Sequence, residues 1–245
     1  MCPLPMNANL SFDPTIPVAE ATSETDDLIY RISHDLRASV RALQDLPTWV
    51  VEDLEKSAVC VPPPTGRHLE LISSHACRLD LMLTGLLEYS RIGRMQPIAP
   101  LKPAEVLDSV LDDLGLPEDV TLAVDLDRGS VQMGDADLAR VFSILLTNAV
   151  RFHPDNAPRI EVVGGPVSDR TWQIDVTDDG PGISEDRREF ILRPMTKLVS
   201  RDVDPGAGMG LAILKKIAET YGGDVTVDAG KNGKGTRVRV TLVVN

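Results

Sequence analysis

His34 and Asp35 are the first residues in this sequence whose types and order suggest chemistry. The stretch DDLIYRISHDLRASVRALQDL (26–46) holds one of the four histidines of the chain and places Asp35 next to it. A neutral imidazole nitrogen is a nucleophile, and an adjacent carboxylate can accept a hydrogen bond from the other ring nitrogen or take its proton. For a lone helix, a solvated surface histidine would be the simpler interpretation.

Asn148 and Arg151 form a second pair, in the stretch LLTNAVRF. We expect a strongly apolar helix over 135–152, which puts the two residues one turn apart on the same side. An amide oxygen is a hard ligand that suits Mg²⁺, and a cation one turn away can reach a phosphate. The pair therefore favours a site for a phosphate and its metal ion.

A carboxylate and two glycines follow at the end of a predicted strand. The stretch DVTDDGPGIS (175–184) gives Asp-x-Gly-x-Gly, formed by Asp178, Gly180 and Gly182. Glycines lack a Cβ atom, so their backbone N–H groups can come close to a ligand. A carboxylate at the end of a strand, beside such a turn, can accept a hydrogen bond from an adenine amino group.

A second glycine cluster opens a helix predicted over 209–221. The stretch PGAGMGLAILKK (205–216) gives Gly-x-Gly-x-Gly, formed by Gly206, Gly208 and Gly210. Exposed backbone N–H groups and the partial positive charge of a helix N-terminus suit phosphates. Each glycine cluster alone also fits a flexible loop. The order of asparagine helix, Asp-Gly loop and glycine-rich loop is what favours a nucleotide site.

A helical hairpin must position His34. Apolar residues recur in steps of three and four, with Ser39 filling one gap, along a first heptad row of Ile29, Ile32, Leu36, Leu43, Leu46 and Val50. A second heptad row is Leu69, Ile72, Ala76, Leu79, Leu83, Leu86 and Ser90. With Ile29 at heptad position a, His34 falls at f, which faces away from the row.

Local signals mark the ends of the two helices and the width of their apolar stripe. Ser23 with Asp26 resembles a capping box and predicts the start of the first helix. Pro47 should kink or break that helix, and residues 59–68 should form a proline-rich loop to the second. Further apolar residues lie beside the rows, namely Leu28, Val40, Met82 and Tyr89. Because this stripe is wider than a two-stranded coil needs, we expect a homodimeric four-helix bundle.

The chain divides into four segments by composition and period. We expect a disordered tail over 1–22, the helical hairpin over 23–95, a linker over 96–103 and an α/β region over 104–245. Helices are expected in or next to that region at 103–114, 135–152, 184–192 and 209–221. Strands are expected at 120–126, 159–165 and 171–178, with a closing hairpin at 223–230 and 235–244. The fold class is thus α plus α/β, with an α/β sandwich of mixed order.

Composition limits the partners. The net charge of −12 and pI near 4.7 disfavour nucleic acid and anionic membrane surfaces. No apolar run approaches the ~18–20 residues of a membrane span, and the start of the chain lacks the features of a secretory signal. The odd number of cysteines, Cys2, Cys60 and Cys77, fits reduced thiols. We expect a cytoplasmic protein with no nucleic-acid or membrane partner.

Taken in order, these motifs resemble those of the sensor histidine kinase family of two-component signalling. SHDLRA resembles its phosphoacceptor box, LLTNAVRFHP its asparagine box, and DDGPGI and GAGMGL its two glycine boxes. EFILRPMTKL (189–198) lies where the family has a phenylalanine-containing box, and YSRIGR and DLPTWVVEDL resemble the phytochrome-like subgroup. The resemblance covers about residues 25–245. It implies a helical dimerisation and phosphotransfer domain followed by an ATP-binding domain of the GHKL or Bergerat type.

The resemblance also implies an activity and a set of roles. The protein would autophosphorylate on His34 at the expense of ATP and pass the phosphoryl group to an aspartate of a response regulator receiver domain. Asn148 would bind Mg²⁺, and Asp178 would bind adenine. Arg151 and the glycine backbones would hold the phosphates, with Asp35 assisting the histidine.

Regulation is implied less directly. Residues of about 193–208 would form a mobile lid over ATP, from which Lys197 or Arg201 could contact phosphate. About 24 residues precede the hairpin, which leaves no room for a sensor. We therefore expect the signal to come from a separate sensor or input protein, from the tail or from the bundle itself, unless the chain is a piece of a longer kinase.

The sequence departs from the family pattern at three positions. Ile144 stands where many members have an asparagine, which removes a polar contact near Asn148 and also removes any group that could activate water for hydrolysis. Ala38 stands where members that dephosphorylate their partner carry threonine or asparagine, so we expect weak phosphatase activity. Ser39 replaces a proline that is common in the family.

Two other functions fit parts of the sequence. A dimeric histidine phosphotransfer protein with a degenerate ATP domain would be compatible with Ile144. Retention of Asn148, Asp178 and the glycines argues against it. A serine kinase or ATPase of the same superfamily would have no use for the helix that carries His34.

Overall fold

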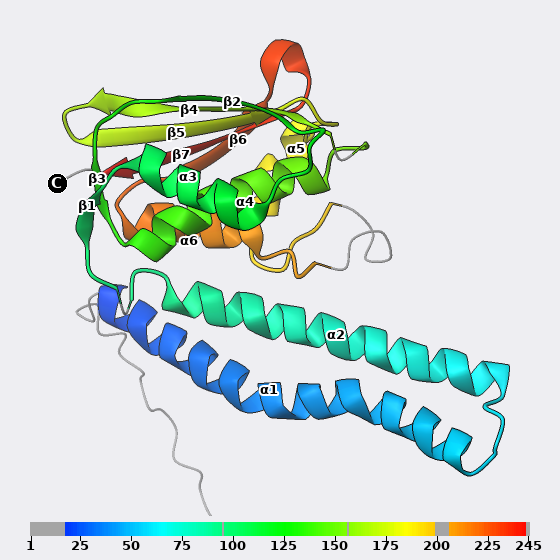
Figure 1. The fold of residues 1–245 in the computed structure, drawn as a ribbon. Coiled ribbons are helices and arrows are strands. Elements are labelled where there is room, and N and C mark those ends of the chain that lie inside the picture. Colours follow the sequence, from blue (N-terminus) through cyan, green and yellow to red (C-terminus); the bar gives the residue numbers. More distant parts are fainter. Residues whose placement is uncertain (1–17, 95, 156, 199–205, 244–245) are drawn as a thin grey trace, which may run out of the picture.

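The structure is a computed structural model that describes residues 18–94, 96–155, 157–198 and 206–243. A long helical hairpin lies along one side of an α/β domain (Figure 1). Residues 1–17 of the predicted tail lie outside the described residues. Among the described residues, no helix combines the length and the apolar character needed to cross a membrane.

The hairpin consists of α1 (Val18–Lys56) and α2 (Pro63–Arg91). The predicted start at Ser23 is wrong, because α1 begins upstream of it and takes in the end of the predicted tail. Pro47 lies inside α1 and does not break it. α2 begins within the predicted loop 59–68, since prolines fit the first turn of a helix, where an N–H group has no helical partner to lose.

The two helices pack through a row of α1 that differs from the predicted one. Among the side chains of α1 that the structure describes, the buried ones are those of Asp26, Ser33, Val40 and Pro47. The first heptad row is mostly exposed instead, at 43% to 50% for Ile32, Leu36, Leu43, Leu46 and Val50. This buried row and the first heptad row both repeat every seven residues, and the buried row, which packs on α2, is the less apolar of the two. The first heptad row therefore remains available for a contact outside this chain.

A five-stranded sheet forms one layer of the α/β domain, in the order β2-β4-β5-β7-β6. Its strands are β2 (Thr121–Leu126), β4 (Arg159–Ser168), β5 (Thr171–Asp178), β7 (Thr236–Val243) and β6 (Val225–Ala229). Only β2 and β4 pair in parallel within this sheet. These strands confirm the predicted ones, and β4 continues beyond the predicted end at 165.

A small two-stranded sheet was not predicted. β1 (Ala99–Leu101) pairs antiparallel with β3 (Val131–Met133). β1 lies inside the predicted linker 96–103, so part of that segment belongs to the folded domain.

Helices cover one face of the large sheet (Figure 1). The predicted helices are confirmed as α3 (Pro103–Leu114), α4 (Asp135–Arg151) and α6 (Gly210–Thr220). The predicted helix 184–192 is wrong as one element, because a short α5 (Glu185–Arg188) is followed by a 3-10 turn, η1 (Phe190–Leu192). A second 3-10 turn, η2 (Lys231–Gly233), joins β6 to β7.

The core lies between this helical layer and the sheet. Alternate residues of β5, Trp172, Ile174 and Val176, are buried against the helices, where Phe142 and Leu146 of α4 are fully buried. This packing fixes α4 over the sheet and brings its last turns to the end of β5. The predicted Asn148 and Asp178 therefore lie on neighbouring elements that contact each other.

Candidate active site

A cavity of about 500 Å³ opens where α4, the end of β5 and the start of α6 meet. Its wall includes most of the predicted nucleotide residues, namely Asn148, Arg151, Asp178, Gly182, Gly206, Gly208 and Gly210. Gly180 lies outside the wall and acts on it through a hydrogen bond to Asp178. The size falls within the range of small-molecule sites.

Asp178 is held in place by the backbone around it. Its Oδ1 accepts hydrogen bonds from the Gly180 N–H at 2.9 Å and from the Thr236 N–H at 3.1 Å. Burial raises the pKa of Asp178, and these two N–H donors oppose that rise in part. Among the described residues Oδ2 receives no hydrogen bond, so this oxygen remains for a donor in the cavity.

Close backbone contacts explain why glycine recurs around the cavity. Gly208 has φ +70°, and a Cβ atom there would lie 2.5 Å from the Thr196 carbonyl oxygen. Gly182 has φ +76°, and its Cβ would lie 2.9 Å from the Gly235 carbonyl oxygen. An L side chain at either position would be strained and would displace backbone. The glycines thus let the loops close on the cavity.

Gly206 and Arg151 lie where the glycine-rich stretch approaches α4. A Cβ atom on Gly206 would lie 2.5 Å from a guanidinium nitrogen of Arg151. Lys197 also lines the cavity. The cations predicted to hold phosphates are therefore at the glycine-rich end, while Arg201 and the lid residues 199–205 lie outside the described residues.

Ile144 lines the same cavity and contributes an apolar side chain to the α4 part of its wall. A Cβ atom on Gly210 would lie 3.3 Å from its side chain. The departure from the family pattern is therefore in the wall itself, one helical turn before Asn148.

Sequence reasoning missed two parts of the site. Gly235, in the turn before β7, packs so tightly that a Cβ atom would overlap the Asp178 carbonyl oxygen. The other part comes from α2, whose Leu81, Thr84, Gly85 and Glu88 line the cavity and are termed the α2 wall. Gly85 is the signal that could have found this wall, because a glycine inside a helix often marks a close approach.

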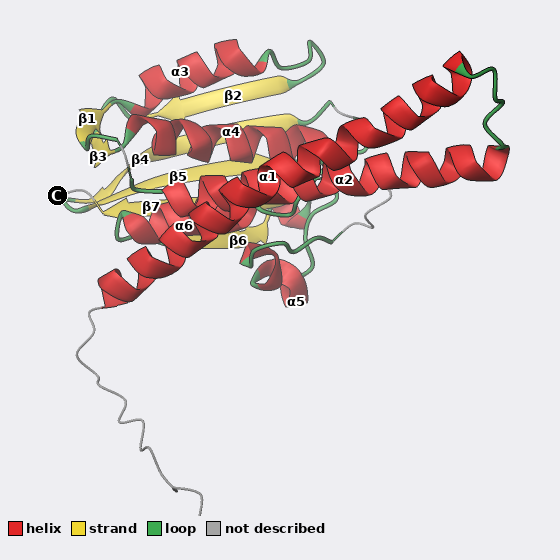
Figure 2. Cartoon of the chain, turned by 90° about the horizontal axis from the view of Figure 1, so that it is seen from below, coloured by secondary structure: helices red, strands yellow, loops and turns green. Residues whose placement is uncertain are grey.

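His34 lies apart from the cavity. Its side chain is 66% exposed on α1, and its Nδ1 lies 3.4 Å from Oδ1 of Asp35. The Tyr30 ring stacks beside it, with 6.2 Å between ring centroids. No described residue of α1 lines the cavity, and α2 lies between most of α1 and the α/β domain (Figures 1 and 2). The structure therefore does not bring His34 and Asp35 to the predicted nucleotide residues.

Comparisons with known proteins agree with this architecture. Residues 134–245 match the family model described as histidine kinase-, DNA gyrase B- and HSP90-like ATPase. The sensor protein KdpD of Rathayibacter rathayi is 33% identical over 93% of this chain and 26% of its own length. Cyanobacterial phytochrome B of Nostoc sp. is 27% identical over 93% of this chain and 30% of its own length. A solved structure of full-length ShkA with AMPPNP has a TM-score of 0.63 at 20% identity, covering 90% of this chain and 46% of that one.

The extent of these matches defines what they establish. The chain spans about a quarter of the length of the KdpD relatives it matches, at 26% and 25%. The solved structure shows a shared fold, in which a helical region precedes an α/β domain of the GHKL type. With the ordered motifs, the ATPase model and the homologous kinases, the chain belongs to the sensor histidine kinase family.

Proposed function

We propose that this protein is an ATP-dependent protein-histidine kinase with His34 as its phosphoacceptor. One observation supports this best: a single chain carries an exposed His–Asp pair and a cavity lined by an amide, a carboxylate, cations and glycine backbone. A phosphotransfer protein with a dead ATP domain would have no physical need for the second feature.

Different residues of the cavity would bind the adenine base, the phosphates and the metal ion. Asp178 Oδ2 would accept a hydrogen bond from the adenine amino group. Arg151 and Lys197, with the backbone N–H groups of 206–210, would hold the phosphates. The Asn148 side-chain oxygen is a suitable ligand for Mg²⁺, which would neutralise phosphate charge when bound.

His34 and Asp35 supply the acceptor chemistry. Nε2 of His34 forms a bond to the γ-phosphorus as the bond from that phosphorus to the bridging oxygen of ADP breaks. Asp35 accepts the hydrogen bond from Nδ1–H, which fixes the tautomer, and takes up that proton as positive charge builds on the ring. Because α2 lies between α1 and the cavity, the α/β domain must move relative to the hairpin before this step.

Two apolar side chains disfavour two competing reactions, the hydrolysis of ATP and the dephosphorylation of the partner. Ile144 cannot activate a water molecule in the cavity, which favours transfer to histidine over hydrolysis of ATP. Ala38 is exposed one turn after His34 and offers no hydrogen bond to orient a water molecule. We therefore propose weak dephosphorylation of the partner by this route.

The partners follow from the surface of the hairpin and from the kinase reaction. The exposed first heptad row would pair with that of a second copy and bury both in a four-helix bundle. The next acceptor would be an aspartate of a response regulator receiver domain, with the signal supplied by a separate input protein. The exposed free thiols of Cys60 and Cys77 support a reducing, cytoplasmic location.

Incubation of the purified protein with γ-labelled ATP and Mg²⁺ tests this function. We expect a label that is stable in alkali and labile in acid, lost in His34→Gln and Asn148→Ala, and retained in His75→Gln. His75 is a matched control because it is also an exposed histidine of the hairpin. Absence of label, together with no nucleotide binding by calorimetry, would contradict the kinase and favour the phosphotransfer protein.

A further inference from the structure

The start of α1 is joined to the α/β domain by a buried ion pair. Lys216 of α6 donates a hydrogen bond from Nζ to Oδ1 of Asp26 at 2.5 Å, and the two side chains are only 10% and 8% exposed. The same Nζ lies 4.2 Å from the centroid of the Tyr89 ring on α2. Asp26, Tyr89 and Lys216, termed the latch, therefore bring three helices together at one point.

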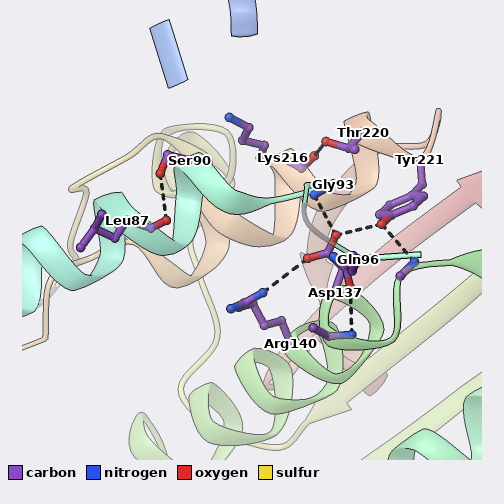
Figure 3. A network of polar contacts seen from close by, with 11 residues as sticks. Leu87, Ser90, Gly93, Gln96, Asp137, Arg140, Lys216, Thr220 and Tyr221 are labelled. Atoms are coloured by element: carbon purple, nitrogen blue, oxygen red, sulfur yellow. Dashed lines mark hydrogen bonds and ion pairs between the residues drawn. The ribbon is translucent and has the colours of Figure 1, made fainter. Parts of the chain in front are cut away.

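A second set of contacts ties the end of α2 to the same domain. Arg94, just after α2, pairs with Asp27 of α1 and also lies 3.9 Å from Oδ2 of Asp26, a member of the latch. The Gly93 N–H donates to Asp137 Oδ2 at 2.9 Å, and the Tyr221 hydroxyl donates to the same oxygen at 2.8 Å (Figure 3). The Gly93 contact joins α2 to the domain without α1. Of these contacts between the hairpin and the α/β domain, the latch is thus the one that depends on the position and rotation of the first turns of α1.

The docked arrangement covers the glycine-rich end of the cavity with α2. A Cβ atom on Gly85 would lie 2.6 Å from Cγ of Met209 and 3.9 Å from Cβ of Ala207. Both partners belong to the glycine-rich stretch that would cradle phosphates, and Met209 is only 3% exposed. The α2 wall therefore lies against the phosphate end, where an incoming histidine would have to approach.

We propose that the latch holds the kinase in a resting state, and that displacement of the start of α1 releases it. This inference rests on the proposed function and adds how that site is regulated. In the latched arrangement the α2 wall blocks the phosphate end, and His34 lies on α1, none of whose described side chains lines the cavity. Rotation of α1 at its start would carry Asp26 away and leave Lys216 charged, buried and unpaired. The latched arrangement then becomes unfavourable, and the α/β domain separates from α2.

Single charge removals should break the latch. Lys216→Met keeps the apolar stem beside Tyr89 and removes the charge, and Asp26→Asn keeps the shape of the other partner. We expect each to raise the initial rate of His34 labelling by about 5-fold or more, the lower end of typical coupling between sites. Lys215→Met is the matched control, since the Lys215 side chain is 40% exposed and, among the described residues, its ion pair is with Glu219 of the same helix at 3.8 Å.

Methionine oxidation gives a readout of undocking that does not require kinase activity. Met209 is covered by α2, whereas Met133 is 1% exposed in the core and Met195 is 44% exposed. With hydrogen peroxide as the probe, we expect Met209 to oxidise faster in Lys216→Met and Asp26→Asn than in the wild type and Lys215→Met. Met133 should stay slow and Met195 fast in all four proteins, which also reports an intact fold.

The two readouts separate the possible failures. Faster Met209 oxidation with faster labelling supports the latch. Faster oxidation with unchanged or slower labelling would overturn it as a restraint on the kinase, and unchanged oxidation would overturn it as a docking contact. If the wild type gives no label at all, the proposed function fails, and Met209 oxidation alone decides whether the latch holds α2 on the cavity.

Discussion

Replacement of Asp178 by asparagine changes the nucleotide site at one oxygen. Oδ1 of Asp178 accepts two backbone N–H groups, from Gly180 at 2.9 Å and Thr236 at 3.1 Å. Both partners are donors, so the single carbonyl oxygen of asparagine must take that position. The amide NH₂ then occupies the place of Oδ2 and points a donor at the adenine amino group, which is also a donor.

The size of the effect follows from this clash of donors. ATP loses one hydrogen bond, and a donor is left unpaired in a buried site, which together cost about 1–3 kcal/mol. Binding of an ATP analogue should weaken roughly 5- to 150-fold. A guanine presents a carbonyl oxygen at the corresponding position and gains an acceptable partner, so the preference for adenine over guanine nucleotides should fall.

Calorimetry with AMP-PNP and GMP-PNP measures both effects. Asp179→Asn is the control, because Asp179 is 47% exposed, accepts the Arg159 N–H at 2.8 Å and does not line the cavity. It should leave both affinities unchanged. Undiminished AMP-PNP binding by Asp178→Asn, or an equal loss for both nucleotides, would refute the adenine-binding role of Asp178.

Three further predictions concern the stability of the α/β domain, the glycine-rich stretch and the dimer interface of the hairpin. Tyr221→Phe removes a hydroxyl that donates to a buried carboxylate and accepts a backbone N–H, and should lower the free energy of unfolding by about 1–3 kcal/mol. Burial raises the pKa of Tyr221 to about 12 from 10.0. The stabilisation by this hydroxyl is therefore present below pH 10 and is lost as the pH rises to 12. Chemical denaturation across that range should show the unfolding free energies of the variant and the wild type converging. Gly208→Ala combines φ +70° with a Cβ atom 2.5 Å from a carbonyl oxygen, whereas Gly115→Ala has φ +54° in open space. Gly115→Ala should lower the free energy of unfolding by about 1–2 kcal/mol, and Gly208→Ala should lower it by clearly more. Equal losses of stability would contradict the close contact at Gly208. Leu43→Asp puts a charge in the exposed first heptad row and removes about 1.5–3 kcal/mol of stabilisation by apolar burial from each of two protomers. Sedimentation should therefore show monomers. An unchanged dimer would mean that the interface lies elsewhere.

The elements that carry the site were predictable because their signals are local. The apolar face of α4 and the alternation along β5 lie within single short segments, and both were predicted within a few residues. Asn148 and Asp178 could be assigned to one cavity because their elements belong to one recognisable order of motifs. The short β1 and β3 were missed, since three-residue strands carry too little pattern to detect.

Contacts between segments that are distant in the sequence were harder to predict. Steps of three and four identify an apolar stripe on α1, but Val40 and Leu43 belong to adjacent rows with the same period. The period alone does not decide which row packs on α2. Lys216 is likewise an ordinary lysine in its sequence context, and only the fold places it on Asp26. The same holds for the α2 wall, where Gly85 gives a hint of close packing but no indication of its partner.

Locating the phosphoryl group after incubation with ATP and Mg²⁺ tests the central claim most directly. Mass spectrometry of peptides kept in alkali should find one phosphoryl group on the peptide that carries His34, and none on those that carry His68, His75 or His153. A phosphoryl group on any other residue, or none on a protein that binds ATP by calorimetry, would contradict the assignment of His34 as the phosphoacceptor.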